Sequence, residues 1–265
     1  MNNSSNEYML QKRLFVEALV EKDYMEIYAS NLLKNDFIIK FGEPKYELHK
    51  LEITIAKTKL KLEMMQACIK FNRPIDVEYI DRTLEKEFEN HNTILKNMKK
   101  ELEFVRGLSP EGDLPFQEAE QLKKLYLSIA GFVHPEMAGK EDKKAKRLWT
   151  SARTAYEHGE LEKLAKLEEK VLAEYKGSVA MEGQNRDTPE EQVITLKNRT
   201  ENVMSEIEKL KRQFPFNEAG MLGDAAAASK FRKDMDFDIT IAREVLDKLE
   251  KQILEKLPSP GKYLN

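Results

Sequence analysis

Apolar residues repeat along most of the chain with the spacing of an α-helix. Between residues 46 and 70 they step by three and four positions, and a similar series runs from 77 to 105 after Asn72-Arg73-Pro74. This repeat is typical of coiled-coil packing, and the short proline turn predicts an antiparallel helical hairpin. The expected seam positions are Leu48, Leu51, Ile55, Thr58, Leu62, Met65 and Ile69, then Val77, Ile80, Leu84, Phe88, Leu95, Met98, Leu102 and Val105.

A second hairpin with the same spacing is predicted near the C-terminal end. Thr188-Pro189-Glu190-Glu191 has the features of a helix start, because threonine caps well, proline fits the first helical position and Glu191 can complete a capping box. A series from Val193 to Phe214 follows. After the break at Phe214-Pro215-Phe216-Asn217, another series runs from Met235 to Ile253. We therefore expect a coiled-coil hairpin over residues 189–257.

Shorter helices are predicted before and between the hairpins. An amphipathic stretch runs from Leu14 to Ile39, and Phe41-Gly42-Glu43-Pro44 predicts its end. A helix from Gln117 must end by Val133, because His134 precedes a proline. The helical pattern resumes near Asp142, pauses at His158-Gly159 and continues to Val171.

These boundaries give an all-α chain of several parts. The parts are an N-terminal helical segment (1–44), a helical hairpin (45–106), a unit of shorter helices (113–175), a polar linker (176–188), the C-terminal hairpin (189–257) and a tail (258–265). Composition agrees, since 11 glycines and 9 prolines in 265 residues are too few for the frequent turns of a β-sandwich or barrel. The two hairpins thus flank the unit of shorter helices.

Charge and cysteine content exclude several classes of protein. The net charge of −3 gives no support to a nucleic-acid binder, which normally carries a basic face. Cys68 is the single cysteine, so no internal disulfide or cysteine-based zinc site is expected. The N-terminus lacks a signal pattern, and no run approaches the ~20 apolar residues of a membrane span. We expect a soluble cytoplasmic protein without metal, cofactor or membrane association.

Motifs for catalysis are not found in the sequence. It has no glycine-rich phosphate loop, no nucleophile elbow and no His-Glu-x-x-His pair. The four histidines are far apart, and no orienting partner for a His134 general base can be named. The many carboxylates are best interpreted as solvated helix faces. We therefore predict a protein that is not an enzyme and has no catalytic residue.

One stretch resembles a known family. From Gln121 an amphipathic helix ends at His134-Pro135-Glu136, a polar loop follows, and a second helix contains an aromatic residue and then an Ala-Tyr pair. This resembles the J-domain of DnaJ-type cochaperones, whose helices II and III flank a His-Pro-Asp loop. The matching residues are Lys123, Lys124, Tyr126, Ile129, Ala130, His134, Pro135, Trp149, Ala155 and Tyr156. The wider architecture is similar to bacterial DnaJ-like proteins in which helical hairpins flank the J-like unit.

The resemblance implies a site and a partner. It implies an antiparallel helix pair within residues 113–175 that binds an Hsp70 (DnaK-type) partner and stimulates its ATPase. His134 and Pro135 would shape the loop, Glu136 would make a charged contact, and Lys123 and Lys124 would steer the partner. The client protein is not indicated.

Departures from the family pattern leave an alternative open. Glu136 stands where the family has aspartate, and Leu127, Ser128 and Phe132 replace residues that are usually basic. The alternative is therefore a non-catalytic coiled-coil adaptor whose J-like unit no longer activates Hsp70. The seams also leave two oligomeric states open, a monomer or a coiled-coil homodimer, because a second chain could complete them.

Overall fold

The computed structural model describes residues 2–107, 116–138, 142–175 and 188–257. Every regular element in these ranges is a helix, which confirms the predicted all-α class. The chain forms two compact units, and each combines two separate stretches of sequence. Unit 1 contains residues 1–34 and 110–218, and unit 2 contains residues 35–109 and 219–265. None of the helices in the described ranges is both long enough and apolar enough to cross a membrane.

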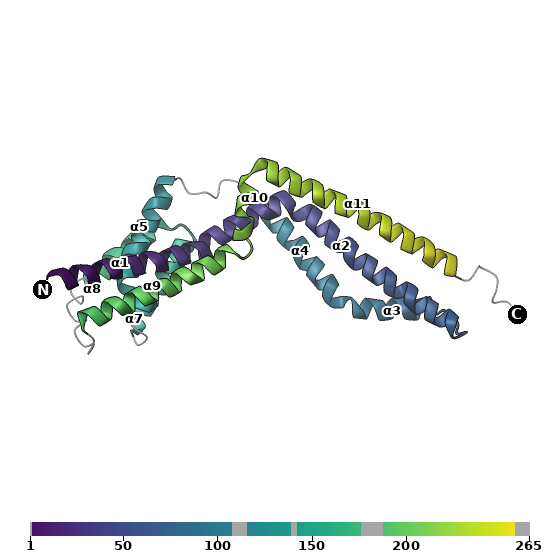
Figure 1. Ribbon diagram of the computed structural model, residues 1–265, viewed down its shortest axis with the longest axis horizontal. Helices are drawn as coiled ribbons and strands as arrows, with labels where there is room; N and C mark the ends of the chain where they lie inside the picture. Colours follow the sequence, from purple (N-terminus) through teal and green to yellow (C-terminus); the bar gives the residue numbers. More distant parts are fainter. Residues whose placement is uncertain (1, 108–115, 139–141, 176–187, 258–265) are drawn as a thin grey trace. The chain divides into compact units, whose positions relative to one another are not determined.

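Unit 1 contains the unit of shorter helices together with two long helices. Its first stretch is α1 (Asn2–Tyr24), a single π-helical turn η1 (Met25–Ala29) and the start of α2 (Ser30–Lys70). Figure 1 shows α1 beside α9 (Pro189–Lys211), which is drawn in green. The remaining helices of the unit are α5 (Phe116–Val133), α6 (Pro135–Ala138), α7 (Lys143–Glu157) and α8 (Leu161–Tyr175), with a 3₁₀ turn η4 (Phe216–Glu218) at its end.

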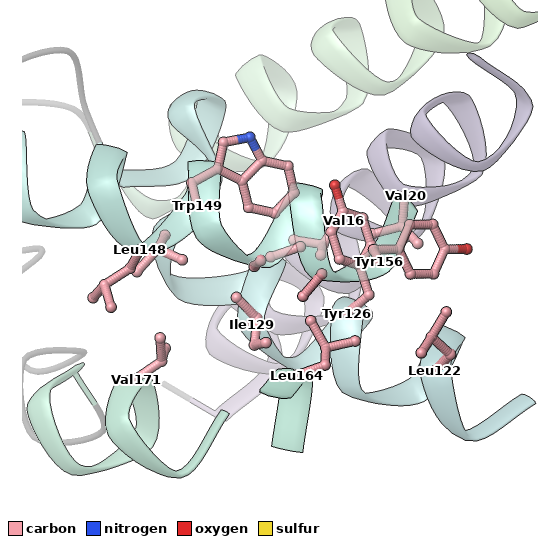
Figure 2. Close-up of a cluster of buried hydrophobic side chains, with 14 of the residues drawn as sticks. Val16, Val20, Leu122, Tyr126, Ile129, Leu148, Trp149, Tyr156, Leu164 and Val171 are labelled. Atoms are coloured by element: carbon pink, nitrogen blue, oxygen red, sulfur yellow. The ribbon is translucent and has the colours of Figure 1, made fainter. Parts of the chain in front are cut away.

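The core of unit 1 lies between α1, α5, α7 and α8. Each of these helices places apolar side chains at three- and four-residue spacing toward a common centre, where they exclude water. Figure 2 shows this cluster, with Val16 and Val20 of α1 close to the tyrosines of α5 and α7. Tyr126 and Ile129 are completely buried, as are Leu164 and Val171 of α8. The helical spacing of Trp149 and Tyr156 predicts that both lie in the core, and both are buried.

Local signals in the sequence set the ends of several helices. The Asp142 carboxylate accepts hydrogen bonds from the backbone N–H groups of Lys144 and Ala145 and so caps α7. His158 is the C-cap of α7, and the next residue, Gly159, adopts a positive φ of 66°, which glycine tolerates without strain. Thr188 and Glu191 form the predicted capping box at the start of α9.

Unit 2 contains the rest of α2 with α3 (Val77–Glu87), α4 (Glu89–Gly107), α10 (Ala219–Gly223) and α11 (Ala225–Lys256). The stretch expected as one long helix from Val77 to Val105 is divided at Phe88 into α3 and α4. α2, α3 and α11 share an apolar cluster that includes Ile53, Met65, Ile80, Leu84 and Ile253. The predicted seam position Ile69, by contrast, is 48% exposed.

The helix end predicted at Phe41-Gly42-Glu43-Pro44 is wrong, because α2 continues through Pro44. A proline inside a helix removes the hydrogen bond to the carbonyl oxygen four residues earlier. That oxygen belongs to Lys40, and Nη1 of Arg232 on α11 donates a hydrogen bond to it over 3.1 Å. Gly42 also has a packing role, since a Cβ atom there would lie 2.6 Å from Cδ1 of Leu102. Contacts from other helices thus stabilise a helix that the local sequence would end.

Several predicted connections lie outside the described residues. They include residues 108–115, between the predicted hairpin and the helices of the following unit, residues 139–141 of the loop after His134, residues 176–187 of the predicted linker, and the tail 258–265.

Candidate partner-binding site

The site is built on the antiparallel helices α5 and α7. The rings of Tyr126 and Tyr156 stack with their centroids 4.1 Å apart, and Trp149 packs 5.0 Å from Tyr126. Beyond them, the His134 ring meets Trp149 edge to face at 4.5 Å. Later residues of α5 therefore contact earlier residues of α7. The aromatic stack fixes the end of α5, and with it the start of the His134-Pro135-Glu136 loop.

His134 is buried, with 8% of its surface exposed. The backbone N–H of Glu136 donates a hydrogen bond to its Nδ1 over 3.1 Å, so the proton of the neutral ring is on Nε2. Nε2 lies 3.9 Å from Oδ2 of Asp23 on α1. Burial disfavours the charged imidazolium and lowers the pKa of His134 to about 4. The ring is therefore neutral at pH 7, and both of its nitrogens lie beside groups of the protein.

Asp23 connects α1 to the site. Its Oδ2 accepts a hydrogen bond of 2.9 Å from the hydroxyl of Tyr126. Burial raises the pKa of the Asp23 carboxyl, and the hydrogen bond from Tyr126 acts in the opposite direction. The π-helical turn η1 begins two residues later at Met25, and such turns occur frequently at functional sites.

Pro135 and Glu136 form the surface of the loop. Pro135 is the first residue of α6, a position that suits proline because no backbone N–H is required there. The Glu136 side chain is 57% exposed, yet Nη2 of Arg199 on α9 donates to its Oε2 over 2.6 Å and to its backbone oxygen over 2.7 Å. The Arg199 guanidinium also lies over the Phe15 ring of α1, 4.5 Å from the ring centroid. The charged group of the loop is therefore already paired within the chain.

The two lysines of α5 have different surroundings. Nζ of Lys123 lies 3.0 Å from Oε2 of Glu21 and 5.2 Å from the ring centroid of Tyr24, both on α1. Lys124 is 75% exposed and lies 4.0 Å from the Glu120 carboxylate of its own helix. α1 thus passes beside one lysine while the other faces solvent.

The structure brings most of the predicted site residues into one region of unit 1. Glu21 and Asp23, two residues apart on α1, contact Lys123 and His134 respectively. Sequence reasoning did not identify Asp23, Glu21 or Arg199. Their spacing in the sequence gives no signal of a site, because the predicted site residues that they contact are 63 to 111 positions away.

The neutral His134 ring has no free nitrogen lone pair for acid–base chemistry. A general base needs a lone pair directed at a substrate, whereas Nδ1 of His134 accepts the N–H of Glu136. Among the residues that the structure describes, no group of three or more His, Cys, Asp or Glu side chains is placed to hold a metal ion. Comparisons with known proteins return no match to a family model, to a curated protein or to a solved structure.

Proposed function

We propose that this chain is a J-domain-like cochaperone of the cytoplasm. It engages an Hsp70 (DnaK-type) partner through α5 and the His134-Pro135-Glu136 loop and stimulates the ATPase of that partner. The observation that supports this function best is the position of the loop, which lies at the end of an antiparallel helix pair joined by Tyr126, Trp149 and Tyr156. The chain itself hydrolyses nothing, and its hairpins select clients or set the reach of the unit.

The roles of four of the five site residues follow from their surroundings. His134 accepts a hydrogen bond from the N–H of Glu136 and packs on Trp149, so it anchors the loop to the buried core. Pro135 restricts φ at the first position of α6. Glu136 presents a carboxylate at the surface, which suits a charge-assisted hydrogen bond with a partner. Lys124 adds exposed positive charge, which raises the rate of encounter with an acidic surface.

The test is the steady-state ATPase of a bacterial Hsp70 with increasing amounts of this protein. We expect stimulation by the wild-type chain and its loss in His134→Gln. His91→Gln is the matched control, because this histidine is an exposed residue of α4 in unit 2. Equal stimulation by wild type and His134→Gln would contradict the proposal.

The contacts of Glu136 and Lys123 with Arg199 and Glu21 favour a second candidate, a coiled-coil adaptor whose J-like unit has only a packing role. Glu136→Asp distinguishes an inactivated J-domain from this adaptor. If wild type does not stimulate but Glu136→Asp does, the unit is a J-domain that the longer side chain has inactivated. If neither protein stimulates, the adaptor is favoured.

A further inference from the structure

Helices α1 and α9 contact the residues of unit 1 that the proposed function assigns to partner binding. Glu136 is paired with Arg199 of α9. Lys123 is paired with Glu21 of α1, and the His134 ring lies beside Asp23. Three of the five proposed contact residues therefore have neighbours on α1 or α9.

Arg199 makes the most specific of these contacts. Most ion pairs at a protein surface contribute little, because solvent screens them and two long side chains must be ordered. Here one nitrogen of Arg199 donates to both the side chain and the backbone of Glu136, and the guanidinium plane is held on Phe15, which is 1% exposed. Because the contact with Phe15 already restricts the Arg199 side chain, forming its hydrogen bonds costs less conformational entropy. The pair is therefore stronger than an ordinary surface ion pair.

The packing of α1 against α9 places Arg199 over the loop. Phe15 and Leu19 of α1 share an apolar cluster with Leu196 of α9, and Met137 of α6 packs against the same cluster. Lys197 of α9 forms a separate ion pair with Glu7 of α1, 3.0 Å long, which does not include the loop. The two helices are therefore joined independently of Glu136, and Arg199 can release the loop while the helices stay together.

We propose that α1 and α9 compete with the Hsp70 partner for the loop and for Lys123, and that Arg199 sets the strength of this competition. The inference rests on the proposed function. A partner that binds here must supply a positively charged group to replace Arg199 on Glu136 and a negatively charged group to replace Glu21 on Lys123. The free protein then has a low affinity for the partner. On binding, groups of the partner with the same charge replace Arg199 and Glu21.

The test combines a measurement on the protein alone with the ATPase assay, for Arg199→Ala and for the control Lys197→Ala. Amide hydrogen exchange reports on the loop, since the N–H groups of Glu136, Met137 and Ala138 all bond to His134. In Arg199→Ala we expect these amides to exchange about tenfold faster, as loss of a charge-assisted hydrogen bond implies. We also expect the concentration giving half-maximal ATPase stimulation to fall about fivefold or more. Lys197→Ala should change neither quantity.

Each other outcome identifies which statement fails. Unchanged exchange in Arg199→Ala would show that Arg199 does not hold the loop and would overturn the inference alone. Suppose that wild type stimulates the ATPase and that Arg199→Ala shows faster exchange but no stronger stimulation. This result would also overturn the inference, because the loop would open without improving binding of the partner. Faster exchange with no stimulation by either protein would overturn the proposed function, and the inference with it. Stimulation that persists in Arg199→Ala/His134→Gln would show that the gain does not pass through the loop.

Discussion

Arg232 donates a hydrogen bond from Nη1 to the backbone oxygen of Lys40, the acceptor that Pro44 leaves without its helical partner. The two residues are 192 positions apart and belong to different helices of unit 2. A side chain of α11 thus supplies the donor that proline cannot, and α2 passes Pro44 without ending.

Arg232→Ala is expected to lower the free energy of unfolding by about 1 kcal/mol, the usual net value of one hydrogen bond. In a Pro44→Ala background the cost should be smaller, because residue 44 then has an N–H for the Lys40 oxygen. Urea unfolding of the four proteins in this double-mutant cycle measures the coupling. Arg243→Ala is the control, since Arg243 of α11 pairs with Glu47 of α2 rather than with the Lys40 oxygen. Equal costs of Arg232→Ala in both backgrounds would disprove the compensation.

His134 should make the protein less stable as pH falls from 7 to 4. Its pKa is about 4 in the folded chain against an ordinary value of 6.5. Between these values the unfolded chain binds a proton that the folded chain does not, so stability is lost as pH is lowered through this window. The full effect is about 3 kcal/mol at 1.36 kcal/mol per pKa unit. Unfolding free energies of wild type and His134→Gln, followed across this range, give the difference.

The comparison of wild type with His134→Gln is needed because other charged groups near His134 also affect the pH dependence of stability. Glu136 favours the protonated ring, whereas Arg199, Lys22 and Arg153 oppose it. The raised pKa of Asp23 contributes a pH dependence of opposite sign, because burial makes its neutral form more stable in the folded chain. These groups remain in His134→Gln, so a variant with the same pH dependence as wild type would refute the assignment to His134.

Tyr126→Phe should destabilise the protein by about 1.5–3 kcal/mol at pH 7, the cost of removing a donor from a charged acceptor. The Asp23 carboxylate would be left with less compensation for its burial, and its pKa would rise further. The cost should therefore decrease at low pH, where the carboxyl is protonated. Tyr156→Phe is the matched control, because this tyrosine stacks on Tyr126 but does not donate to Asp23. Equal costs for the two variants would show that the hydroxyl of Tyr126 is unimportant.

Leu84→Ala and Ile69→Ala should separate the two oligomeric states that the heptad pattern allows. Leu84 is completely buried within unit 2, so its truncation should cost about 2–5 kcal/mol. Ile69 is 48% exposed, and its truncation should cost less than about 1 kcal/mol. Denaturant unfolding at two protein concentrations tests this. A large cost for Ile69→Ala that depends on concentration would instead show that a second chain completes the seam.

Helix ends were predictable where the determining groups are neighbours in sequence. Asp76 bonds the N–H of Tyr79, and Thr188 bonds that of Glu191, so both caps could be inferred from short motifs. The course of α2 through Pro44 could not be predicted, because its compensating donor lies on another helix. The local sequence predicts a helix end poorly where a tertiary contact replaces a hydrogen bond that the helix itself lacks.

The same reasoning applies to the candidate site. Helical spacing predicts that Trp149 and Tyr156 lie in the core, and the structure confirms their burial. Tyr126, identified only as a match to the J-domain pattern, is buried with them. The groups that surround the loop did not follow, because Asp23 and Arg199 occupy ordinary positions on amphipathic helices. Only the path of the chain brings them to His134 and Glu136.

The discontinuous make-up of unit 1 has a consequence during protein synthesis. Lys22 of α1 and Glu206 of α9 form an ion pair across 184 positions, and Phe15 and Leu19 are covered by the same helix. While the ribosome is still adding the intervening residues, α5, α7 and α8 can already assemble, because they are close in sequence. Phe15 and Leu19 of α1, which α9 covers, stay accessible to other molecules until α9 has emerged. The nascent chain therefore displays for a time the kind of surface that chaperones recognise.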